Sequence, residues 1–434
     1  MTSSIANGAA LRVGIDARLR SGQPGGVQQV IIGLASGLSR LDAGDEEYHF
    51  LVYPSHFDWL VPYLDGSCRL LFARPEPSWK RIAKAFPPTA FALRAARGLS
   101  LAPWTNRAEP RVASSSVPSS DGSIEAACLH LIHFPKQDAF LTRVPSIYHP
   151  HDIQHVHYPE FFSEELRNTR EVHYRTLCEQ ASMVSVTSCW TANDVASHFG
   201  LPDEKMAVVH LAPALSAYEP VASTEIDRVA AAFSTPERFI LYPAQTWAHK
   251  NHIRLLEALD AIRRRYEVSI PLICTSTKNE FYATIQAKVR ELRMQDTVLF
   301  TGFVSPTELR ALYELAHCVV VPSLFEAAGG FGPIAEAFMS RRPVACSNVT
   351  SLPDEVGDAA LLFDPFSVDD IAECVWRLWT RPELCRTLVV RGCEKVARYD
   401  WLLTARIFRA HYRRLTGFPL GKDDVRLLAM PPLY

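Results

Sequence analysis

The chain has 434 residues, of which 48% are hydrophobic and 21% charged, and its formal net charge is −2. This length predicts two or three domains, and the composition is typical of a globular protein that buries a core. The near-neutral charge argues against a nucleic-acid-binding protein. Ten cysteines without a CxxC pair indicate reduced thiols and argue against a disulfide scaffold or a zinc site.

Two features of the sequence indicate where in the cell the protein resides. Residues 1–10 lack the basic start and apolar core of a signal peptide, and no run of 18 apolar residues occurs. We therefore expect a cytoplasmic protein. Residues 79–99 mix basic and aromatic side chains, which leaves open a peripheral contact with the inner face of a membrane or with a lipid-linked acceptor. Ordinary surface helices with snorkelling lysines are the alternative.

The chain opens as a strand, a glycine loop and a helix. Residues 11–15 form an apolar run, and Gly25 and Gly26 precede a helical stripe of Val27, Val30, Ile31 and Leu34. The two glycines are predicted to face a phosphate or a sugar, with simple tight-turn chemistry as the alternative. The spacing does not match the GxGxxG fingerprint of dinucleotide-binding folds.

The first half continues as a series of strands and helices. Ser163 is predicted to cap a helix that runs to about Ala181, and Thr191 with Asp194 resembles a capping box. Residues 213–223 combine proline with small side chains and are predicted to be an interdomain linker. Further strands are predicted at residues 48–53, 129–133, 146–148, 183–187 and 207–211.

Five ligand-type residues crowd into nine positions: His149, His151, Asp152, His155 and His157. Strand-like alternation would place three of these histidines on one side, but the spacing matches no common zinc motif. One functional histidine at the end of a strand, His151 with the neighbouring Asp152, is the favoured prediction. Histidine titrates near neutral pH and can hydrogen-bond sugar hydroxyls.

The second half begins another series at a strand predicted over residues 239–242. Asn251 is predicted to cap the helix that starts at His252, so Lys250 lies just before a helix N-terminus. A lysine there suits a phosphate contact, and an exposed loop lysine is the alternative. Strands are also predicted at residues 268–275, 298–301, 318–321 and 344–347, and helix caps at Ser305, Ser367 and Thr380.

The stretch 318–343 holds the densest pattern: a buried strand ended by Pro322 and Ser323, a glycine loop, and a helix with Pro333 at its first position. A glycine loop before a helix N-terminus predicts an anion site, because free amide groups and the helix dipole point at it. Glu326 and Glu336 flank the loop, and a carboxylate one turn inside a helix can accept hydrogen bonds from two sugar hydroxyls. An ordinary βα turn, with Glu336 as a solvated helix residue, is the alternative.

These elements predict an α/β protein of two doubly wound, Rossmann-like domains that face a cleft. We place the domains at residues 1–215 and 216–401, with a C-terminal helix in 402–434 that packs back on the first domain. The chain contains no D-x-D triplet, the usual carboxylate handle for a metal-held nucleotide diphosphate. We therefore expect neither a metal ion nor another cofactor, and a diphosphate held by Lys250 and backbone amides.

Several motifs together resemble the retaining, GT-B-fold glycosyltransferases of family 4. In the second half they lie at residues 249–259, 301–326, 330–338 and 341–365. In the first half, similar motifs lie at residues 14–18, 25–27 and 151–163. The resemblance implies transfer of a hexose from a GDP-, UDP- or dTDP-linked donor in the second domain to a glycan or lipid-linked acceptor in the first, as in surface polysaccharide synthesis.

The resemblance also implies a role for each matching residue. Glu336 would hold the ribose, Glu326 would lie by the donor sugar, Lys250 would neutralise the leaving diphosphate, and His151 would contact the sugar at the reacting centre. The implied catalytic residues are thus His151, Glu326 and Lys250. The implied donor-binding residues are Gly25, Gly26, Gln245, Lys250, Ser323, Gly329, Gly330, Phe331, Gly332 and Glu336.

Two departures from the family pattern matter. Nine residues separate Glu326 from Glu336, where the family usually has seven, and Ala244 stands where an arginine is common. Gln245 or Thr246 would replace that arginine only in part, since neither is charged.

A front-face substitution is the leading mechanism, and Glu326 as a covalent nucleophile is the alternative. A catalytically silent carbohydrate-binding partner, or a nucleotide-sugar epimerase or phosphorylase of the same fold, is the alternative function.

Overall fold

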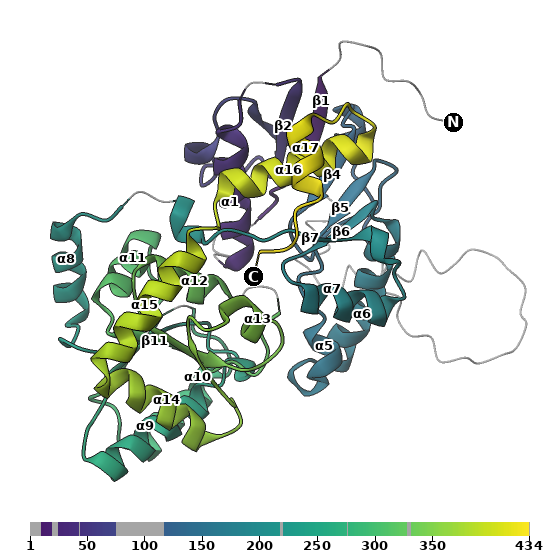
Figure 1. The fold of residues 1–434 in the computed structure, drawn as a ribbon. Coiled ribbons are helices and arrows are strands. Elements are labelled where there is room, and N and C mark those ends of the chain that lie inside the picture. Colours follow the sequence, from purple (N-terminus) through teal and green to yellow (C-terminus); the bar gives the residue numbers. More distant parts are fainter. Residues whose placement is uncertain are drawn as a thin grey trace, which may run out of the picture.

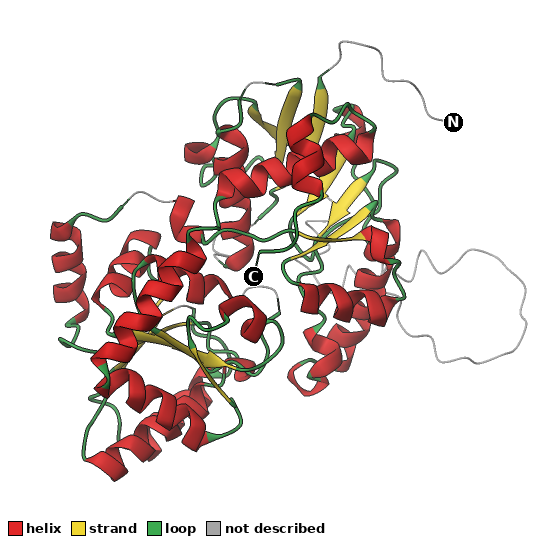
Figure 2. Cartoon of the chain, in the orientation of Figure 1, coloured by secondary structure: helices red, strands yellow, loops and turns green. Residues whose placement is uncertain are grey.

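The computed structural model describes residues 10–19, 25–42, 44–74, 117–217, 220–275, 277–327 and 331–433. These residues form two α/β domains, each built on a parallel sheet (Figure 1). Figure 2 shows that helices cover the faces of both sheets, as parallel sheets require. The predicted fold class is therefore confirmed. The basic and aromatic segment 79–99 lies outside the described residues.

The first domain holds a seven-stranded parallel sheet of order β3-β2-β1-β4-β5-β6-β7. Its strands are short, and all but the outer strands β3 and β7 are largely buried, which explains their apolar runs. They are β1 (Leu11–Asp16), β2 (Glu46–Val52), β3 (Cys68–Phe72), β4 (Leu131–Phe134), β5 (Ser146–Tyr148), β6 (Met183–Val186) and β7 (Met206–Val208). Strand β3 was not predicted from the sequence.

Helices connect most of the strands of the first domain, whereas β4 leads directly into β5. The helices are α1 (Gly26–Ser39), α4 (Ser123–Ala126), α5 (Gln154–His157), α6 (Glu164–Gln180) and α7 (Cys189–Phe199). Short 3-10 turns lie at η1 (Val61–Tyr63), η2 (Pro159–Phe161), η3 (Asp203–Lys205) and η4 (Ala214–Ala217). The predicted cap of α6 is confirmed, because the Ser163 hydroxyl accepts a hydrogen bond from the Leu166 amide at 3.2 Å.

The second domain holds a six-stranded parallel sheet of order β10-β9-β8-β11-β12-β13. Its strands are β8 (Ile240–Pro243), β9 (Leu272–Thr275), β10 (Val298–Gly302), β11 (Cys318–Val321), β12 (Val344–Ser347) and β13 (Leu361–Phe363). Its helices are α8 (Ser223–Phe233), α9 (His252–Tyr266), α10 (Tyr282–Glu291), α11 (Pro306–Leu315), α12 (Phe331–Met339), α13 (Leu352–Val356), α14 (Val368–Thr380) and α15 (Pro382–Val396), with a 3-10 turn at η5 (Ala248–Lys250).

The chain then returns to the first domain through α16 (Trp401–Thr416) and α17 (Lys422–Leu428). Trp401, Phe408 and Tyr412 of α16 join the apolar core of the first sheet. Helix α16 packs closely on α1 because Gly33 and Gly37 leave room for it: a Cβ at Gly33 would lie 2.0 Å from the Trp401 ring. This return confirms the predicted closing helix.

Two predicted helix caps, at Thr191 and Thr380, are not caps in the structure. Ser188, three residues before Thr191, caps α7, since its hydroxyl accepts from the Thr191 amide at 3.1 Å. Helix α15 starts after Arg381, so Thr380 is the last residue of α14 and caps nothing. Both misplacements follow from reading S/T-x-x-D/E patterns without knowing where the preceding strand or helix ends. The predicted capping box at Ser305 and Glu308 and the cap at Ser367 are confirmed.

Asn251 precedes α9 as predicted, but its side chain does not cap the helix. Its backbone is left-handed (φ 59°), and its side-chain amide donates to the carbonyl oxygens of Pro322 at 2.9 Å and Pro365 at 2.8 Å. Asn251 therefore ties the loop after β8 to the loop after β11. Among the residues that the structure describes, no helix meets the length and hydrophobicity needed to cross a bilayer.

Candidate active site

A cleft of about 1100 Å³ opens between the two domains. It is lined by loops that leave the carboxyl ends of strands in both sheets, among them β1 and β5 in the first domain and β8, β10 and β11 in the second. Ligands of doubly wound sheets bind at this edge, where the strand order reverses. The two reversal points, β1/β4 and β8/β11, supply walls to one cleft.

Lys250 and Glu326 form an ion pair in the wall of the second domain. Lys250 ends η5, directly before α9, and Glu326 follows β11. The Tyr242 hydroxyl donates to the Lys250 carbonyl at 2.7 Å, and the Asn251 bridge fixes the next residue. Only 8% of the Glu326 side chain is exposed, so this ion pair is largely buried and is not a solvent-exposed salt bridge.

Glu336 lies on α12 and borders the same cleft. Burial raises its pKa to about 7, and the neighbouring Tyr313 hydroxyl, which donates to the Pro333 carbonyl oxygen at 3.1 Å, offsets this only in part. Gly332 and Pro333, in the first turn of α12, also line the cleft. The helix begins at Phe331, two residues earlier than predicted, so Pro333 is its third residue. The carboxyl group and the helix N-terminus thus share one side of the cleft.

A third carboxyl group of the cleft, Glu355 on α13, was not predicted. It is 5% exposed, and burial followed by the charge of Glu326 raises its pKa to about 8, against the opposing effects of Ser351 and Lys395. The signal that could have found it is topological. Strand β12 neighbours β11, so the segment after β12 returns to the same edge of the sheet.

His151 and Asp152 form the wall of the first domain that faces these groups. His151 has a left-handed backbone (φ 63°), a strained conformation that active sites often retain. Its Nε2 lies 3.2 Å from the Pro135 carbonyl oxygen, so that nitrogen carries a proton and donates. Burial lowers the pKa of His151, and the ring is neutral at pH 7.

The other residues of the histidine cluster point elsewhere. His149 is buried and its Nε2 lies 2.7 Å from Nε2 of His133, while His155 is buried 3.7 Å from Glu171. His157 pairs with Asp194 at 2.9 Å. The strand-like alternation considered for these histidines does not occur, because residues 154–157 form a helical turn, α5. Within the described ranges, no group of three or more His, Cys, Asp and Glu is arranged to hold a metal ion.

Of the predicted donor-binding residues, Gly25, Gly26, Gln245, Lys250, Gly332 and Glu336 all line the cleft. Gln245 accepts a hydrogen bond from the Trp247 indole at 2.7 Å. Ser323 is not brought to the cleft: it is fully buried, and its hydroxyl lies 3.2 Å from the Tyr242 hydroxyl. Gly329, Gly330 and the Phe331 side chain lie outside the described residues.

Comparison with known proteins points to one class. Residues 223–394 match the family model of glycosyl transferases group 1. The O-antigen chain mannosyltransferase B of Escherichia coli is 27% identical over 253 residues, which cover 58% of this chain and 65% of that protein. The serotype-specific mannosyltransferase WbdA of E. coli is 26% identical over 57% of this chain and 31% of its own length. The chain thus spans less than two thirds of each of these relatives.

The whole fold has close structural neighbours. Anabaena HepE, solved in complex with UDP-glucose, superposes with a TM-score of 0.66 at 15% identity and covers 93% of this chain and 100% of its own. This likeness shows the fold, since so low an identity carries no residue roles. At the level of sequence, the match to the glycosyl transferases group 1 model covers residues 223–394, which lie in the second domain.

Proposed function

We propose that the protein is a retaining glycosyltransferase of family 4 that moves a hexose from a nucleotide-diphosphate sugar to a hydroxyl group of a glycan or lipid-linked acceptor in surface polysaccharide synthesis. One observation carries the proposal: the Lys250–Glu326 pair and Glu336 lie in one cleft with His151 of the opposite domain. Similarity to the O-antigen mannosyltransferase supports mannose as the sugar and polysaccharide as the product.

The second domain offers the chemistry that a nucleotide-sugar donor needs. The leaving diphosphate is an anion, and the Lys250 ammonium group and the N-terminus of α12 both favour negative charge. The Glu336 carboxylate can accept hydrogen bonds from two ribose hydroxyls. Electrostatic stabilisation of the leaving group is the main demand of the reaction. We therefore propose transfer without a metal ion or another cofactor.

In this proposal the acceptor hydroxyl attacks from the side of the first domain, on the face that the diphosphate leaves. His151 hydrogen-bonds the transferred sugar as a neutral ring. Glu326, held by Lys250, lies by the sugar and is not a covalent nucleophile. A Glu326→Ala variant that forms no product, but recovers with added azide to give a glycosyl azide, would establish the covalent route instead.

The test is a transfer assay with GDP-mannose, UDP-glucose and dTDP-rhamnose, glycan and lipid-linked acceptors, and EDTA. We expect product from one donor, NMR showing the donor's anomeric configuration retained, and no loss with EDTA. Lys250→Gln should lower kcat by roughly 100- to 1,000-fold, the usual cost of one stabilising donor. Product with inverted configuration, or activity that requires a divalent ion, would contradict the proposal.

The same assay separates the alternatives. Donor binding without transfer or hydrolysis would indicate a carbohydrate-binding partner, and conversion of one nucleotide-sugar into its epimer would indicate an epimerase. Location in the cytoplasm, contact with a membrane through residues 79–99 and the absence of nucleic-acid binding remain predictions from the sequence.

A further inference from the structure

The segment Leu324–Ala327, which carries Glu326, belongs to the second domain by sequence but is held from the first. The Thr191 hydroxyl of α7 donates to the Ala327 carbonyl oxygen at 2.6 Å. The Tyr158 hydroxyl, between α5 and η2, donates to the Leu324 carbonyl oxygen at 3.0 Å. Two carbonyl groups that bracket Glu326 therefore have their side-chain donors on the opposite domain.

Phe325, the residue before Glu326, is enclosed by aromatic rings of the first domain. Its ring centroid lies 5.3 Å from that of His157 and 5.9 Å from those of Tyr158 and Trp190. Both pairs at 5.9 Å are edge-on, with interplanar angles of 76°, the arrangement that aromatic rings prefer. Phe325 is 4% exposed, so separating the domains would bring its ring into water.

The second domain fixes the rest of the segment. The Leu324 amide donates to the His249 carbonyl oxygen at 2.8 Å. The Glu326 carbonyl oxygen accepts from the hydroxyls of Thr350 and Ser351. Glu326 thus sits on a segment shared between the domains.

We propose that Tyr158, Thr191 and the cage of His157, Tyr158 and Trp190 around Phe325 are positioning residues that set Glu326 against the donor sugar only when the domains are closed. Closure and placement of the carboxylate are then one event, which keeps the site incomplete until the acceptor domain is in place. The inference rests on the proposed function for the role of Glu326, but not for the closed arrangement itself.

The test compares wild type with Tyr158→Phe, which removes a hydroxyl group, with Thr191→Val, which replaces a hydroxyl group with a methyl group, and with the double variant. Tyr282→Phe and Thr176→Val are matched controls: Thr176 bonds only within α6, to the Val172 carbonyl oxygen, and Tyr282 packs on Phe300 in the second domain. Small-angle scattering of the ligand-free proteins reports closure. Steady-state kinetics and donor titration report whether the Glu326 carboxylate is correctly placed against the donor sugar.

We expect the double variant to scatter as a larger particle than wild type, to lose at least tenfold in kcat and to bind the donor within threefold of wild type, because Lys250 and Glu336 are untouched. The controls should match wild type in every measurement. A double variant with wild-type scattering and wild-type kcat would overturn the proposal. If wild type turns over no nucleotide-sugar, the proposed function fails, and the scattering comparison still decides whether these contacts hold the domains closed.

Discussion

Two carboxyl groups of the cleft, Glu336 and Glu355, are held with raised pKa values because burial removes water from the charged form. They differ in what surrounds them. Glu336 lies in the first turns of α12, where bound hydroxyl donors would favour its charged form, whereas Glu355 lies near the negative charge of Glu326. The first is suited to bind a ligand, and the second to remain protonated.

Affinity for a nucleotide-sugar should therefore depend on pH through Glu336. Its pKa in the free protein is about 7, so below pH 7 the ribose must displace a proton, and affinity should fall by up to tenfold per pH unit. Glu336→Gln should bind more weakly at pH 8 with a flat profile. Calorimetric titration between pH 5.5 and 8 checks this, with an intact nucleotide-sugar because its diphosphate does not titrate there. Parallel profiles for the two proteins would contradict the assignment.

Glu355 makes a prediction about stability. Its pKa rises from 4.5 when unfolded to about 8 when folded, so folding takes up a proton between these values and stability falls as pH rises. Glu355→Gln removes that dependence. Relative to wild type, the variant should gain stability from pH 5 to pH 8, by an amount on the order of a few kcal/mol, since one pKa unit is about 1.4 kcal/mol.

Urea unfolding at pH 5, 6.5 and 8 measures this difference. Asp354→Asn is the matched control, because Asp354 is the exposed neighbour on the same short helix. Its unfolding free energy should keep a constant offset from that of wild type. If the difference between Glu355→Gln and wild type does not grow with pH, the raised pKa of Glu355 is wrong.

The sequence allowed the cleft carboxyl groups and Lys250 to be predicted only where a strand end or helix start marks them. Lys250, Glu326 and Glu336 lie beside such signals. Ser323 shares the signal, yet its side chain turns into the core. Glu355 lies in the first turn of α13, but a helix of five residues is too short to show a periodic apolar stripe that would predict it. Which way a side chain faces depends on packing between elements that lie far apart in the sequence.

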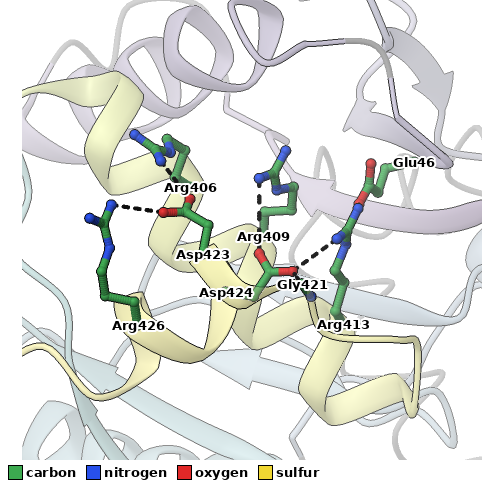
Figure 3. Close-up of polar contacts among 8 residues, drawn as sticks. All are labelled: Glu46, Arg406, Arg409, Arg413, Gly421, Asp423, Asp424 and Arg426. Carbon is green, nitrogen blue, oxygen red and sulfur yellow. Dashed lines mark hydrogen bonds and ion pairs between the residues drawn. The ribbon is translucent and has the colours of Figure 1, made fainter.

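At the scale of elements, α17 and its ion pairs help to hold the C-terminal part of the chain on the first domain (Figure 3). Arg413 of α16 bridges Glu46 of β2 and Asp424 of α17, with 2.9 Å between its Nη1 and the Asp424 carboxylate. Asp424 also accepts from the Gly421 amide at 2.8 Å, which caps α17. It is 2% exposed, so one buried carboxylate joins the last helix to α16 and, through Arg413, to the first sheet.

Asp424→Ala should destabilise the protein by on the order of 3 kcal/mol, because it leaves Arg413 partly unpaired in a buried place and removes a helix cap. Asp423→Ala is the matched control, since Asp423 is adjacent and pairs with Arg406 and Arg426 at the surface. Exposed pairs contribute little, so its unfolding midpoint should shift far less. Equal shifts in urea unfolding for the two variants would show that burial of Asp424 does not matter.

The order and type of most elements could be predicted, because apolar runs of strand length alternate with helical stripes along the chain. Positions 154–157 show where this fails: four residues between two turns fit a strand pattern by spacing but form α5. Strand β3 was missed since a short strand at the edge of a sheet is only partly buried and its side chains alternate weakly. A local sequence pattern does not predict a secondary-structure element where tertiary contacts determine its conformation.

At the scale of the whole molecule, the two sheets place their reversal points on one cleft, and the chain crosses between domains twice, near η4 and before α16. The cleft could be inferred from the fold class, because each sheet brings its ligand edge to it. The contacts of Phe325 with the first domain could not be inferred from the fold class, because they depend on how far the domains close.

The central claim is that Lys250 and the start of α12 hold the donor diphosphate without a metal ion. The most direct measurement is a crystal structure with an intact nucleotide-sugar such as GDP-mannose. We expect diphosphate oxygens within hydrogen-bond distance of Lys250 Nζ and of amides in the first turn of α12, with both ribose hydroxyls on Glu336. A diphosphate bound elsewhere in the cleft, or bridged by a divalent cation, would contradict it.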